Sequence, residues 1–305
     1  MIDIVIINWN AGMLLNNCVN SIRDNNNWDL VSNVFIVDNN STDGSVESIP
    51  PHKKITIVRN KKNEGFAKAC NQGFKICTSK FVLLLNPDTI LLAETLSGCV
   101  QLMNTQTDID ILGCRLLDEE GKTAASCSRF PSPARIFFDA TGLSKLAPTI
   151  FKPASIMTDW SHSESRIVDQ VMGAFMFMQK NIFEKLGYFD ERFFVYYEEV
   201  DFCKRNALAG GKVYFEKEVA AVHIGGGTTQ TVKAFRLFLN LQSRLSYAKK
   251  HFTVAGYFFV VGSTFLIEPF TRILFNLFKR DVKSIKEVLQ GYAYFFGKKQ
   301  AASYK

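Results

Sequence analysis

One short apolar run, Phe81–Leu85, constrains the fold of this chain more than any other stretch of its sequence. A run of this length is too short for a helix and is typical of a strand buried on both faces of a parallel sheet. Pro87 cannot extend the hydrogen-bond ladder and pushes Asn86 out of the helical region, so we expect the strand to end there. Because ligands of open α/β sheets bind at the carboxyl ends of strands, Asp88 is predicted to lie in a crevice. Its carboxylate can ligate a divalent cation that holds a diphosphate, or simply cap a turn.

Apolar strands and amphipathic helices alternate along residues 1–114. We expect strands at 2–7, 34–37, 55–58, 81–85 and 109–114, and helices at 13–24, 66–77 and 92–103, with a further short helix opening in the polar segment 39–45. Alternation at this spacing predicts an α/β fold with a doubly wound, mostly parallel sheet and right-handed crossovers. Asp38 would then end a strand beside the first one, where a carboxylate accepts from a nucleoside's ribose or base, or caps the following turn.

The second half of the chain alternates less regularly. Residues 115–165, with four prolines, form the least patterned part and are expected to cross the crevice as a lid or an acceptor-binding loop. Beyond them the sequence predicts a strand, a short helix capped by Asn181 and ended by Gly187, a second helix and a final strand, at 170–179, 182–186, 198–209 and 219–222.

Several polar residues of this half fall where a strand ends or a helix begins. Glu198, Glu199 and Asp201 come in the first turn of a predicted helix, after an aromatic run that would exclude water. Acids favour a helix N-terminus for structural reasons, but desolvated neighbouring carboxylates also have raised pKa values, as a general base needs. His223 ends a strand before the glycines 225–227, which suits either a structural role or a contact with a metal or phosphate.

The composition excludes several classes of protein. The 305 residues, 47% of them hydrophobic and 21% charged, suffice for one large or two modest domains with a substantial core. Met1 leads straight into an apolar strand, so we expect no signal peptide. The seven cysteines are scattered and include no C-x-x-C pair. We interpret them as buried apolar residues in a reducing cytosol rather than as disulfides or zinc ligands.

Charge is unevenly distributed along the chain. Residues 229–305 hold 13 Lys/Arg against three acids, a net charge of +10, and 16 of the 39 aromatic residues. Residues 1–228 hold the other 23 basic and 26 acidic side chains, a net charge of −3. The sequence therefore predicts a slightly acidic domain followed by a basic, aromatic extension. Nucleic acid is not expected as a partner, because apolar residues outnumber charges in the extension and no RNA- or DNA-binding motif is visible.

One segment of the extension is apolar enough to contact a membrane. Phe252–Ile267 carries no charge, follows a Lys-Lys-His triplet, and is predicted to be broken by Glu268-Pro269. At about 1.5 Å per residue it spans roughly 24 Å, short of a ~30 Å hydrocarbon core. Aromatic residues interleaved with Lys and Arg favour a helix lying in the interface of an anionic leaflet. A re-entrant or spanning segment, and an ordinary core or dimer helix, stay open.

Four groups of motifs occur in an order that indicates one family. They are V-I-I-N-W-N at 5–10, V-D-N-N-S-T-D-G-S at 37–45, N-E-G-F-A-K-A-C-N-Q-G at 63–73 with L-L-N-P-D at 84–88, and Y-Y-E-E-V-D-F-C-K-R at 196–205 followed by V-H-I-G-G-G at 222–227. With this ordered set the chain closely resembles the inverting nucleotide-sugar glycosyltransferases of family 2, which have the GT-A fold, and within them the bacterial rhamnosyltransferase-like branch. The resemblance spans roughly residues 3–250.

The resemblance implies a domain organisation. A GT-A catalytic domain would occupy 1–228, with a nucleotide-binding half at 1–114 and an acceptor-binding and catalytic half at 115–228. The basic, aromatic segment 229–305 would then be a helical extension that associates with a membrane surface.

The resemblance also assigns roles to individual residues. It implies that the donor nucleotide is contacted by Asn8, Asn10, Asp38, Asn63, Gly65, Phe66, Asn71 and Asn86. Asp88 and His223 would hold Mg²⁺ or Mn²⁺ with the donor's diphosphate. Glu199 would be the catalytic base, supported by Glu198 and Asp201. Two positions depart from the family pattern, because Asn86 replaces the first acid of a D-x-D motif and Glu199 replaces an aspartate; the choice between Glu198 and Glu199 as base stays open.

The predicted function follows from these roles. A sugar, rhamnose or a related hexose, would pass with inversion from a dTDP- or UDP-sugar to a hydroxyl group of a glycan or lipid-linked acceptor. The setting would be cell-surface polysaccharide synthesis, with the protein in the cytoplasm, peripheral on the inner face of the plasma membrane.

Two alternatives come from other classes. A sugar nucleotidyltransferase would need a glycine-rich basic loop after the first strand, which is not seen, and neither a Rossmann fingerprint nor a P-loop is present. A catalytically inactive membrane scaffold or glycan-binding partner would have no use for Asp38, Asp88, Glu199 and His223 together.

Overall fold

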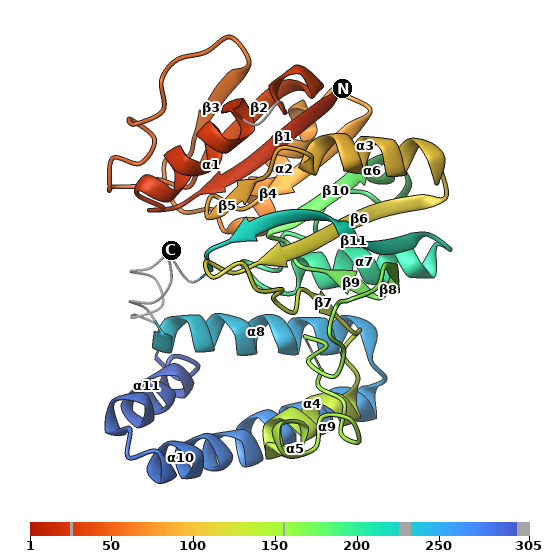
Figure 1. The fold of residues 1–305 in the computed structure, drawn as a ribbon. Helices are drawn as coiled ribbons and strands as arrows, with labels where there is room; N and C mark the ends of the chain where they lie inside the picture. Colours follow the sequence, from red (N-terminus) through yellow and green to blue (C-terminus); the bar gives the residue numbers. More distant parts are fainter. Residues whose placement is uncertain (25–26, 155, 226–232, 298–305) are drawn as a thin grey trace.

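The computed structural model describes residues 1–24, 27–154, 156–225 and 233–297. Within these residues nine strands form one sheet in the order β3-β2-β1-β4-β10-β6-β11-β5, with β8 paired to β11, while β7 and β9 form a small second sheet. The C-terminal helices lie together beyond one side of the large sheet (Figure 1). The predicted α/β fold with a C-terminal helical extension is therefore confirmed. Gly226, Gly227 and Thr228, which follow the predicted histidine, lie outside the described residues.

The first half of the sheet is parallel, as predicted. β1 lies between β2 and β4, and β3 flanks β2. Every residue of β4 is buried, in agreement with its unbroken apolar run. Because the three inner strands run in one direction, their carboxyl ends meet at one edge of the sheet. The four strands are Ile2–Asn8, Val31–Asp38, Ile55–Arg59 and Phe81–Leu85.

The second half of the sheet mixes both directions. β6 and β11 pair parallel, whereas β10 runs antiparallel between β4 and β6, and β5 and β8 run antiparallel to β11. A bend at 172–174 divides the predicted strand 170–179 into β9 and β10. The strands of this half are Thr89–Leu91 (β5), Ile109–Leu117 (β6), Cys127–Ser128 (β7), Arg166–Val168 (β8), Gln170–Val171 (β9), Phe175–Gln179 (β10) and Lys212–His223 (β11).

Alternate side chains of the strands enter two separate cores. Ile4 and Ile6 of β1 pack with α1 and α3 on one face of the sheet, whereas Val5 and Ile7 pack with α2, α6 and α7 on the other. α2 approaches β1 closely because it presents Gly73, where an added Cβ would lie 2.4 Å from Cγ1 of Val5. The helices are Met13–Asp24 (α1), Phe66–Ile76 (α2), Thr95–Thr105 (α3), Ile182–Leu186 (α6) and Glu198–Leu208 (α7), with a 3-10 turn at Trp28–Leu30.

Two local predictions are wrong. Residues 39–50 form turns rather than a helix, because short polar side chains bind one another there: Ser41 Oγ donates to Asp38 at 2.6 Å and Ser45 Oγ donates to Asp43 at 2.6 Å. Such local hydrogen bonds compete with those of a helix. Asn181 occupies the N-cap position of α6, but its side chain makes no capping hydrogen bond.

The weakly patterned excursion contains two helices, α4 (Pro133–Thr141) and α5 (Leu143–Leu146). α4 begins where Ser132 Oγ accepts from the N–H of Arg135 at 3.3 Å, and it ends at Gly142 in the left-handed region with φ +80°. α4 packs against the C-terminal helices, and Figure 1 shows it beside α9. The excursion therefore joins the sheet to the extension.

The described part of the extension is helical. Its elements are α8 (Lys233–His251), α9 (Val254–Gly262), a π-helical turn (Ser263–Ile267), α10 (Glu268–Phe278) and α11 (Val282–Ala293). The predicted break at Glu268-Pro269 is wrong, since Val254–Phe278 forms one continuous helix. Proline clashes with a preceding carbonyl group in a regular helix, and the wider π turn just before it relieves that clash.

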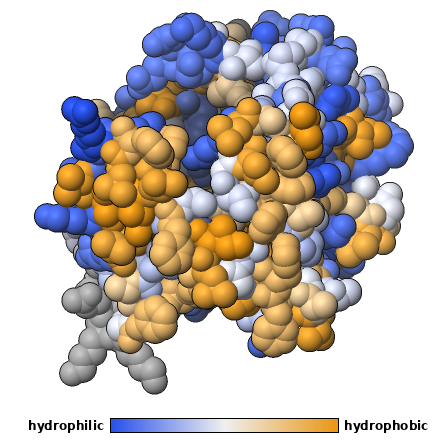
Figure 2. All heavy atoms as spheres, turned by 90° about the horizontal axis from the view of Figure 1, so that it is seen from below, coloured by the Kyte–Doolittle hydropathy of each residue, from blue (hydrophilic) through white to orange (hydrophobic). Residues whose placement is uncertain are grey.

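Large apolar side chains gather on the outer side of the extension. Figure 2 shows much of this face in apolar colours. The continuous helix Val254–Phe278 is long and apolar enough to cross a membrane by length and composition, and 22% of its most apolar stretch is buried inside the protein. The exposed side chains include Val254, Phe258, Leu266, Phe270, Leu274 and Phe278, with Leu146 and Ile150 near α5.

Candidate active site

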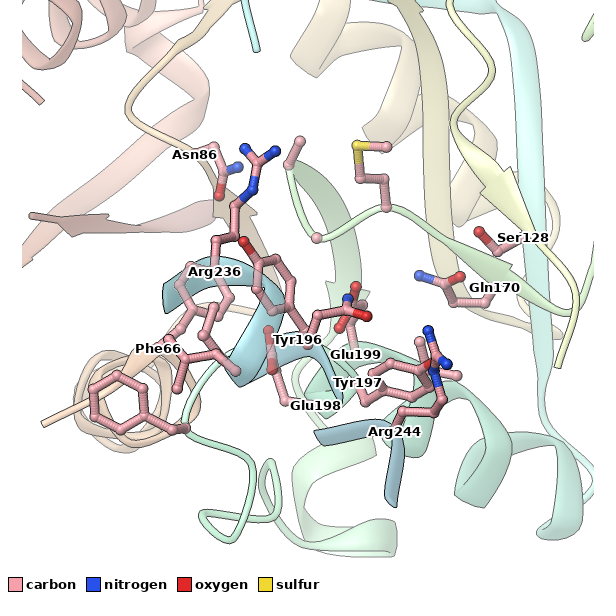
Figure 3. A pocket seen from close by; sticks show the side chains of 18 of the residues that line it. Phe66, Asn86, Ser128, Gln170, Tyr196, Tyr197, Glu198, Glu199, Arg236 and Arg244 are labelled. Carbon is pink, nitrogen blue, oxygen red and sulfur yellow. The ribbon is translucent and has the colours of Figure 1, made fainter. Parts of the chain in front are cut away.

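A cavity of about 590 Å³ lies at the carboxyl ends of β1 and β4. Its walls come from the ends of these strands, the excursion around 128–156, the bend before β10, the first turn of α7 and one face of α8 (Figure 3). The residues that line it thus come from both halves of the predicted catalytic domain and from the extension. Carboxyl ends of strands are where open α/β sheets bind ligands, which makes this cavity the candidate site.

Asp88 and His223 meet at one end of this cavity. After the turn that ends β4, β5 pairs with the last residues of β11, and Thr89 lies opposite His223. The N–H of Ile224 donates to the carbonyl oxygen of Asp88 at 3.0 Å. This pairing brings Nε2 of His223 to 3.3 Å from Oδ1 of Asp88. The two residues that the resemblance assigned to a metal are therefore neighbours in space.

The donor atoms at this end fit a divalent cation with few protein ligands. Oδ1 of Asp88 is buried and accepts no hydrogen bond from the described residues, as suits an oxygen that ligates an ion. Asn86 lines the same end of the cavity. Across the described ranges, no three His, Cys, Asp or Glu side chains lie close enough to hold an ion by themselves. A cation here would take its remaining ligands from phosphate oxygens and water, as Mg²⁺ commonly does.

Glu198 and Glu199 open α7 at another wall of the cavity (Figure 3). Glu198 is only 4% exposed, and Oε2 of each carboxyl group is buried without a hydrogen-bond partner in the described structure. Burial raises the pKa of Glu198 well above its ordinary value, and the charge of Glu199 raises it further. Burial also raises the pKa of Glu199, against the opposing effect of backbone N–H groups. A carboxylate with a raised pKa is a stronger proton acceptor.

The backbone just before α7 is strained. Tyr196 and Tyr197 have φ values of 68° and 71°, in the left-handed region that residues other than glycine rarely adopt. This conformation turns the chain sharply into α7 and leaves both following glutamates on the cavity wall. The preceding Phe194 is fixed by a 2.6 Å hydrogen bond from the N–H of Phe66 to its carbonyl oxygen. Gly65 is required beside it, since a Cβ there would lie 2.6 Å from the same oxygen and its φ is +89°.

Asp201 lies behind the glutamates and does not line the cavity. Its carboxylate accepts hydrogen bonds from Nε of Arg205 at 2.9 Å and pairs with Nε2 of His251 at 2.7 Å and Nζ of Lys250 at 2.6 Å. Burial alone would raise the pKa of Asp201, but these bonds outweigh burial and lower it. Because Lys250 and His251 end α8, this ion cluster fastens α7 to the extension.

Asn8, Asn10 and Asp38 also lie behind the cavity wall rather than on it. Nδ2 of Asn8 donates to Oδ1 of Asp38 at 2.8 Å, and Asn10 accepts from the N–H of Thr42 at 2.8 Å. The same network includes Ser41, whose Oγ accepts from the N–H of Asn10 at 2.9 Å. These predicted nucleotide-binding residues therefore shape the loops that follow β1 and β2.

Trp9 and Asn39 line the cavity at this end instead. Each directly follows a residue of the network, and neighbouring side chains of an extended chain point in opposite directions. The sequence contained a signal for Trp9, since a large aromatic residue stands between two asparagines at a strand end. Whether Asn8 or Trp9, and Asp38 or Asn39, faces the cavity depends on the register of β1 and β2, which the sequence does not show.

The segment that leads into α2 contributes Asn63 and Phe66 to the cavity wall. Oδ1 of Asn63 accepts from the N–H of Gly65 at 3.0 Å, which holds the tight turn before the helix. Asn71 does not line the cavity. It binds the backbone of Phe189 in both directions, with Nδ2 donating at 2.9 Å and Oδ1 accepting at 3.0 Å. Asn71 therefore fastens α2 to the loop that leads to α7.

α8 closes the cavity with residues that no motif had assigned. They lie on one face of the helix at spacings of one and four residues, the pattern of a continuous helical face. The prediction of a separate basic, aromatic extension at 229–305 assigns them no role in the site. The residues are Phe235, Arg236, Leu239, Asn240 and Arg244.

Arg244 is buried between the cavity and α10. Its guanidinium group binds Glu268, which also accepts from Nη2 of Arg272 at 2.7 Å, and it hydrogen-bonds the side chain of Tyr197. Burial would lower the pKa of Arg244, but the charge of Glu268 raises it overall. One buried carboxylate is thus shared by two guanidinium groups, and this ion triad connects the apolar helix to Tyr197, the residue that precedes Glu198 and Glu199.

The sheet and the cavity at its strand ends define an α/β protein with the GT-A fold. The chain superposes on the mannosyltransferase PcManGT from Pyrobaculum calidifontis in complex with GDP-Man and Mn²⁺ with a TM-score of 0.56 and 14% sequence identity, covering 99% of this chain and 77% of that one. A likeness at this identity concerns the fold alone.

The chain belongs to glycosyl transferase family 2, whose sequence profile matches residues 3–187. It is 25% identical over 215 residues to the low-salt glycan biosynthesis hexosyltransferase Agl10 of Haloferax volcanii, covering 69% of this chain and 65% of that protein. It is 23% identical over 207 residues to the N-acetylglucosaminyl-diphospho-decaprenol L-rhamnosyltransferase of Mycobacterium tuberculosis, covering 62% of this chain and 66% of that protein. The chain spans slightly less than two thirds of the length of these relatives. The predicted family, with its rhamnosyltransferase-like branch, is confirmed.

Proposed function

We propose that this chain is an inverting glycosyltransferase that moves a sugar from a nucleoside-diphosphate donor to a hydroxyl group of a glycan or lipid-linked acceptor in cell-surface polysaccharide synthesis. One observation carries the proposal: the Asp88–His223 pair and the Glu198–Glu199 pair, far apart in sequence, line the same cavity. The first pair suits the diphosphate leaving group, and the second suits the acceptor hydroxyl. Membership in family 2 supports the same reaction.

The donor nucleotide would occupy the end of the cavity nearest β1. Trp9 and Phe66 offer aromatic surfaces for its base, and Asn39 and Asn63 offer amide groups for hydrogen bonds. The hydrogen-bond network of Asn8, Asn10 and Asp38 would keep these loops in place before the donor binds. In this proposal the loops after β1 and β2 still bind the nucleotide, as predicted. The direct contacts come from Trp9 and Asn39 rather than from Asn8, Asn10 and Asp38.

Asp88 and His223 would hold Mg²⁺ or Mn²⁺ at the other end of the donor. When bound, such an ion offsets the negative charge that develops on the leaving diphosphate. The side chain of Asn86 is neutral, so within this segment Asp88 alone would offset the charge of the cation. More of the positive charge of the cation would then be available to the diphosphate. The buried, unbonded Oδ1 of Asp88 supports this role.

Glu199 would accept the proton of the acceptor hydroxyl group. The hydroxyl oxygen forms a bond to the anomeric carbon as the bond from that carbon to the diphosphate oxygen breaks, so the configuration inverts in one displacement. Burial raises the pKa of both glutamates. Glu199 is the less deeply buried of the two, so its carboxylate is the more accessible to an acceptor.

The acceptor would enter from the side of the extension. Ile136 and Ala154 of the excursion and Leu239 of α8 give that part of the cavity an apolar wall. A lipid-linked acceptor with rhamnose as the transferred sugar is the form we favour, supported by the relative named for rhamnosyl transfer to a decaprenol-linked substrate. The nucleotide of the donor, dTDP or UDP, is part of the same proposal.

A membrane surface would contact the apolar outer face of α9 and α10. Phe258, Phe270 and Phe278 are each more than half exposed, and Lys279 and Arg280 follow directly. The inner side of the same helix is occupied by α4, α8 and α11, and Glu268 is paired there. Only one side is therefore free for lipid, which favours a helix lying in the interface over one that spans the bilayer. The cytoplasmic location on the inner face of the plasma membrane stays a prediction.

The test is a thermal-shift panel of dTDP-, UDP- and GDP-sugars with and without Mn²⁺. We expect one nucleotide class to raise the melting temperature, and Mn²⁺ to increase that shift. Asp88→Asn should retain the fold and lose the effect of Mn²⁺, since the amide cannot supply the charge. A protein that responds to none of these sugars would contradict the transferase and favour a scaffold.

A further inference from the structure

Arg236 reaches across the cavity from α8 toward the end of β4. Figure 3 shows its guanidinium group pointing toward Asn86. Arg236 also lines the cavity, and its charge opposes the burial that raises the pKa of Tyr196 to about 12. Since Asn86 stands two residues before Asp88, this cation lies at the metal end of the cavity rather than at the end of Glu199.

Two further arginines on the cavity wall pair with carboxylates. Arg129 makes two hydrogen bonds to Asp159, at 2.7 and 2.8 Å, and Arg244 is bound to Glu268. They serve the packing of the excursion and of α10, and the metal end of the cavity draws no positive charge from them.

Charge balance shows what the metal end requires. A divalent cation held by one carboxylate and one imidazole would leave a net charge of +1, whereas a nucleoside diphosphate carries roughly two to three negative charges. About one to two negative charges then lack compensation in a site of low dielectric constant. A guanidinium group supplies a permanent positive charge and paired N–H donors that match phosphate oxygens. Arg236 occupies the position where such a group is needed.

We infer that Arg236 binds the diphosphate of the donor, its N–H groups donating to phosphate oxygens on the side away from Asp88 and His223. The inference rests on the proposed function. In this role Arg236 would neutralise the leaving group together with the metal, and it makes the extension part of the donor site. The neutral side chain of Asn86 fits this role, because a carboxylate there would pair with the arginine and reduce its attraction for phosphate.

The experiment compares nucleoside diphosphates with the corresponding monophosphates. Dissociation constants of UDP and UMP, and of dTDP and dTMP, are measured by calorimetry on the full chain, with Mn²⁺ and with EDTA. We expect Arg236→Met to weaken diphosphate binding roughly 10-fold to 100-fold, the loss typical of a charge-assisted hydrogen bond, with a much smaller change for the monophosphate. Arg236→Lys should recover part of the preference, because it restores the charge without the paired donors.

Lys233→Ala is the matched control, since it removes an exposed cation from the same helix. It should leave the diphosphate-to-monophosphate ratio unchanged, and the melting temperature of each variant reports its folding. A folded Arg236→Met protein with the ratio of the unsubstituted protein would overturn the inference while leaving the proposed function intact. Failure of the unsubstituted protein to bind any of the four nucleotides would overturn both.

Discussion

The sheet region and the C-terminal extension bury their apolar side chains in opposite ways. In β1 and β4 every residue is buried between two helical layers. In the helix Val254–Phe278 only 22% of the most apolar stretch is buried, although the mean hydropathy is 1.5. Both regions are therefore rich in apolar side chains but differ in how much of them is buried. The first region is stabilised by its own core, whereas the second retains an apolar surface that another phase can cover.

Charged groups connect the two regions behind the cavity. Asp201 of α7 binds Lys250 and His251 at the end of α8, and Arg244 of α8 binds Glu268 of α10. Both clusters are buried and lie next to the first turn of α7. The comparison therefore teaches that the extension has two faces: an inner face that completes the cavity and an outer face that is free for a membrane.

The largest expected effect is on catalysis and falls in the sheet region. Glu199→Gln should lower the transfer rate by about 10²-fold to 10⁴-fold, the contribution of a general base, while nucleotide binding is retained. The rate of the unsubstituted protein should rise with pH through the raised pKa of Glu199, since only the ionised group accepts a proton. Glu198→Gln is the matched control and should retain more activity. If Glu198→Gln is the inactive variant, the roles of the two glutamates are exchanged.

Next in size is the loss of the ion triad that joins the regions. Glu268→Gln should destabilise the fold by about 3 kcal/mol, because it leaves the buried guanidinium group of Arg244 without a counter-charge. Arg272→Gln removes the partner that is 41% exposed and should cost much less. Urea unfolding measures both. Equal, small losses would mean that the extension does not depend on this contact.

A pair of glycines tests how tightly each region is packed. Gly73→Ala in α2 should destabilise by about 1–3 kcal/mol, since the new Cβ would overlap Val5 of β1. Gly262→Ala in the extension meets no atom within 4 Å and has helical φ of −58°, so it should stabilise by roughly 0.5–1 kcal/mol. Thermal or chemical unfolding of the two variants gives the comparison. Shifts of the same sign would refute the proposed difference in packing.

The buried glutamate pair also predicts a pH dependence of stability. The folded-state pKa of Glu198 is raised, so the folded protein holds this proton after the unfolded chain has lost it. The protonated Glu198 therefore contributes stability that is fully present below the pKa of the unfolded chain, about 4.3. This contribution is lost as the pH rises through the pKa of the folded protein. The glutamine of the Glu198→Gln variant cannot ionise, so this variant should lose less stability than the unsubstituted protein between pH 5 and pH 8. The slopes of stability against pH should differ by the amount expected for about one bound proton. Identical melting curves across this range would contradict the assignment.

The smallest expected effect on stability comes from the outer face of the extension. Phe270→Ser with Phe278→Ser, at side chains that are 71% and 80% exposed, should change stability by no more than about 0.5 kcal/mol per site. The same variant should lose cosedimentation with vesicles of anionic phospholipid. Leu208→Ser is the control, because Leu208 is 72% exposed in the sheet region. Retained vesicle binding by the double variant would refute the membrane surface.

Much of the fold could be predicted because local pattern and tertiary structure agree in the sheet region. The bounds of α1 and α6 and the strand Phe81–Leu85 match the predictions, since a short apolar run between breakers has few alternative structures. The candidate site was predictable where a residue ends a strand, as at Asp88 and His223. The loop after β2 was not predictable, because side-chain hydrogen bonds replaced the expected helix. The helix across Glu268-Pro269 was not predictable either, because a π turn accommodates the proline.

The sequence by itself determined the layered fold and the family, and it indicated Asp88 and His223 after strand ends and two glutamates at a helix start, because strand ends and apolar periodicity are local properties of the chain. Only the tertiary structure decided which neighbour of each motif faces the cavity, that Asp38, Asn71 and Asp201 lie behind its wall, and that α8 closes it with Arg236 and Arg244. The reason is physical: the direction of a side chain at a loop depends on strand register, and the position of α8 depends on buried ion pairs between residues distant in sequence.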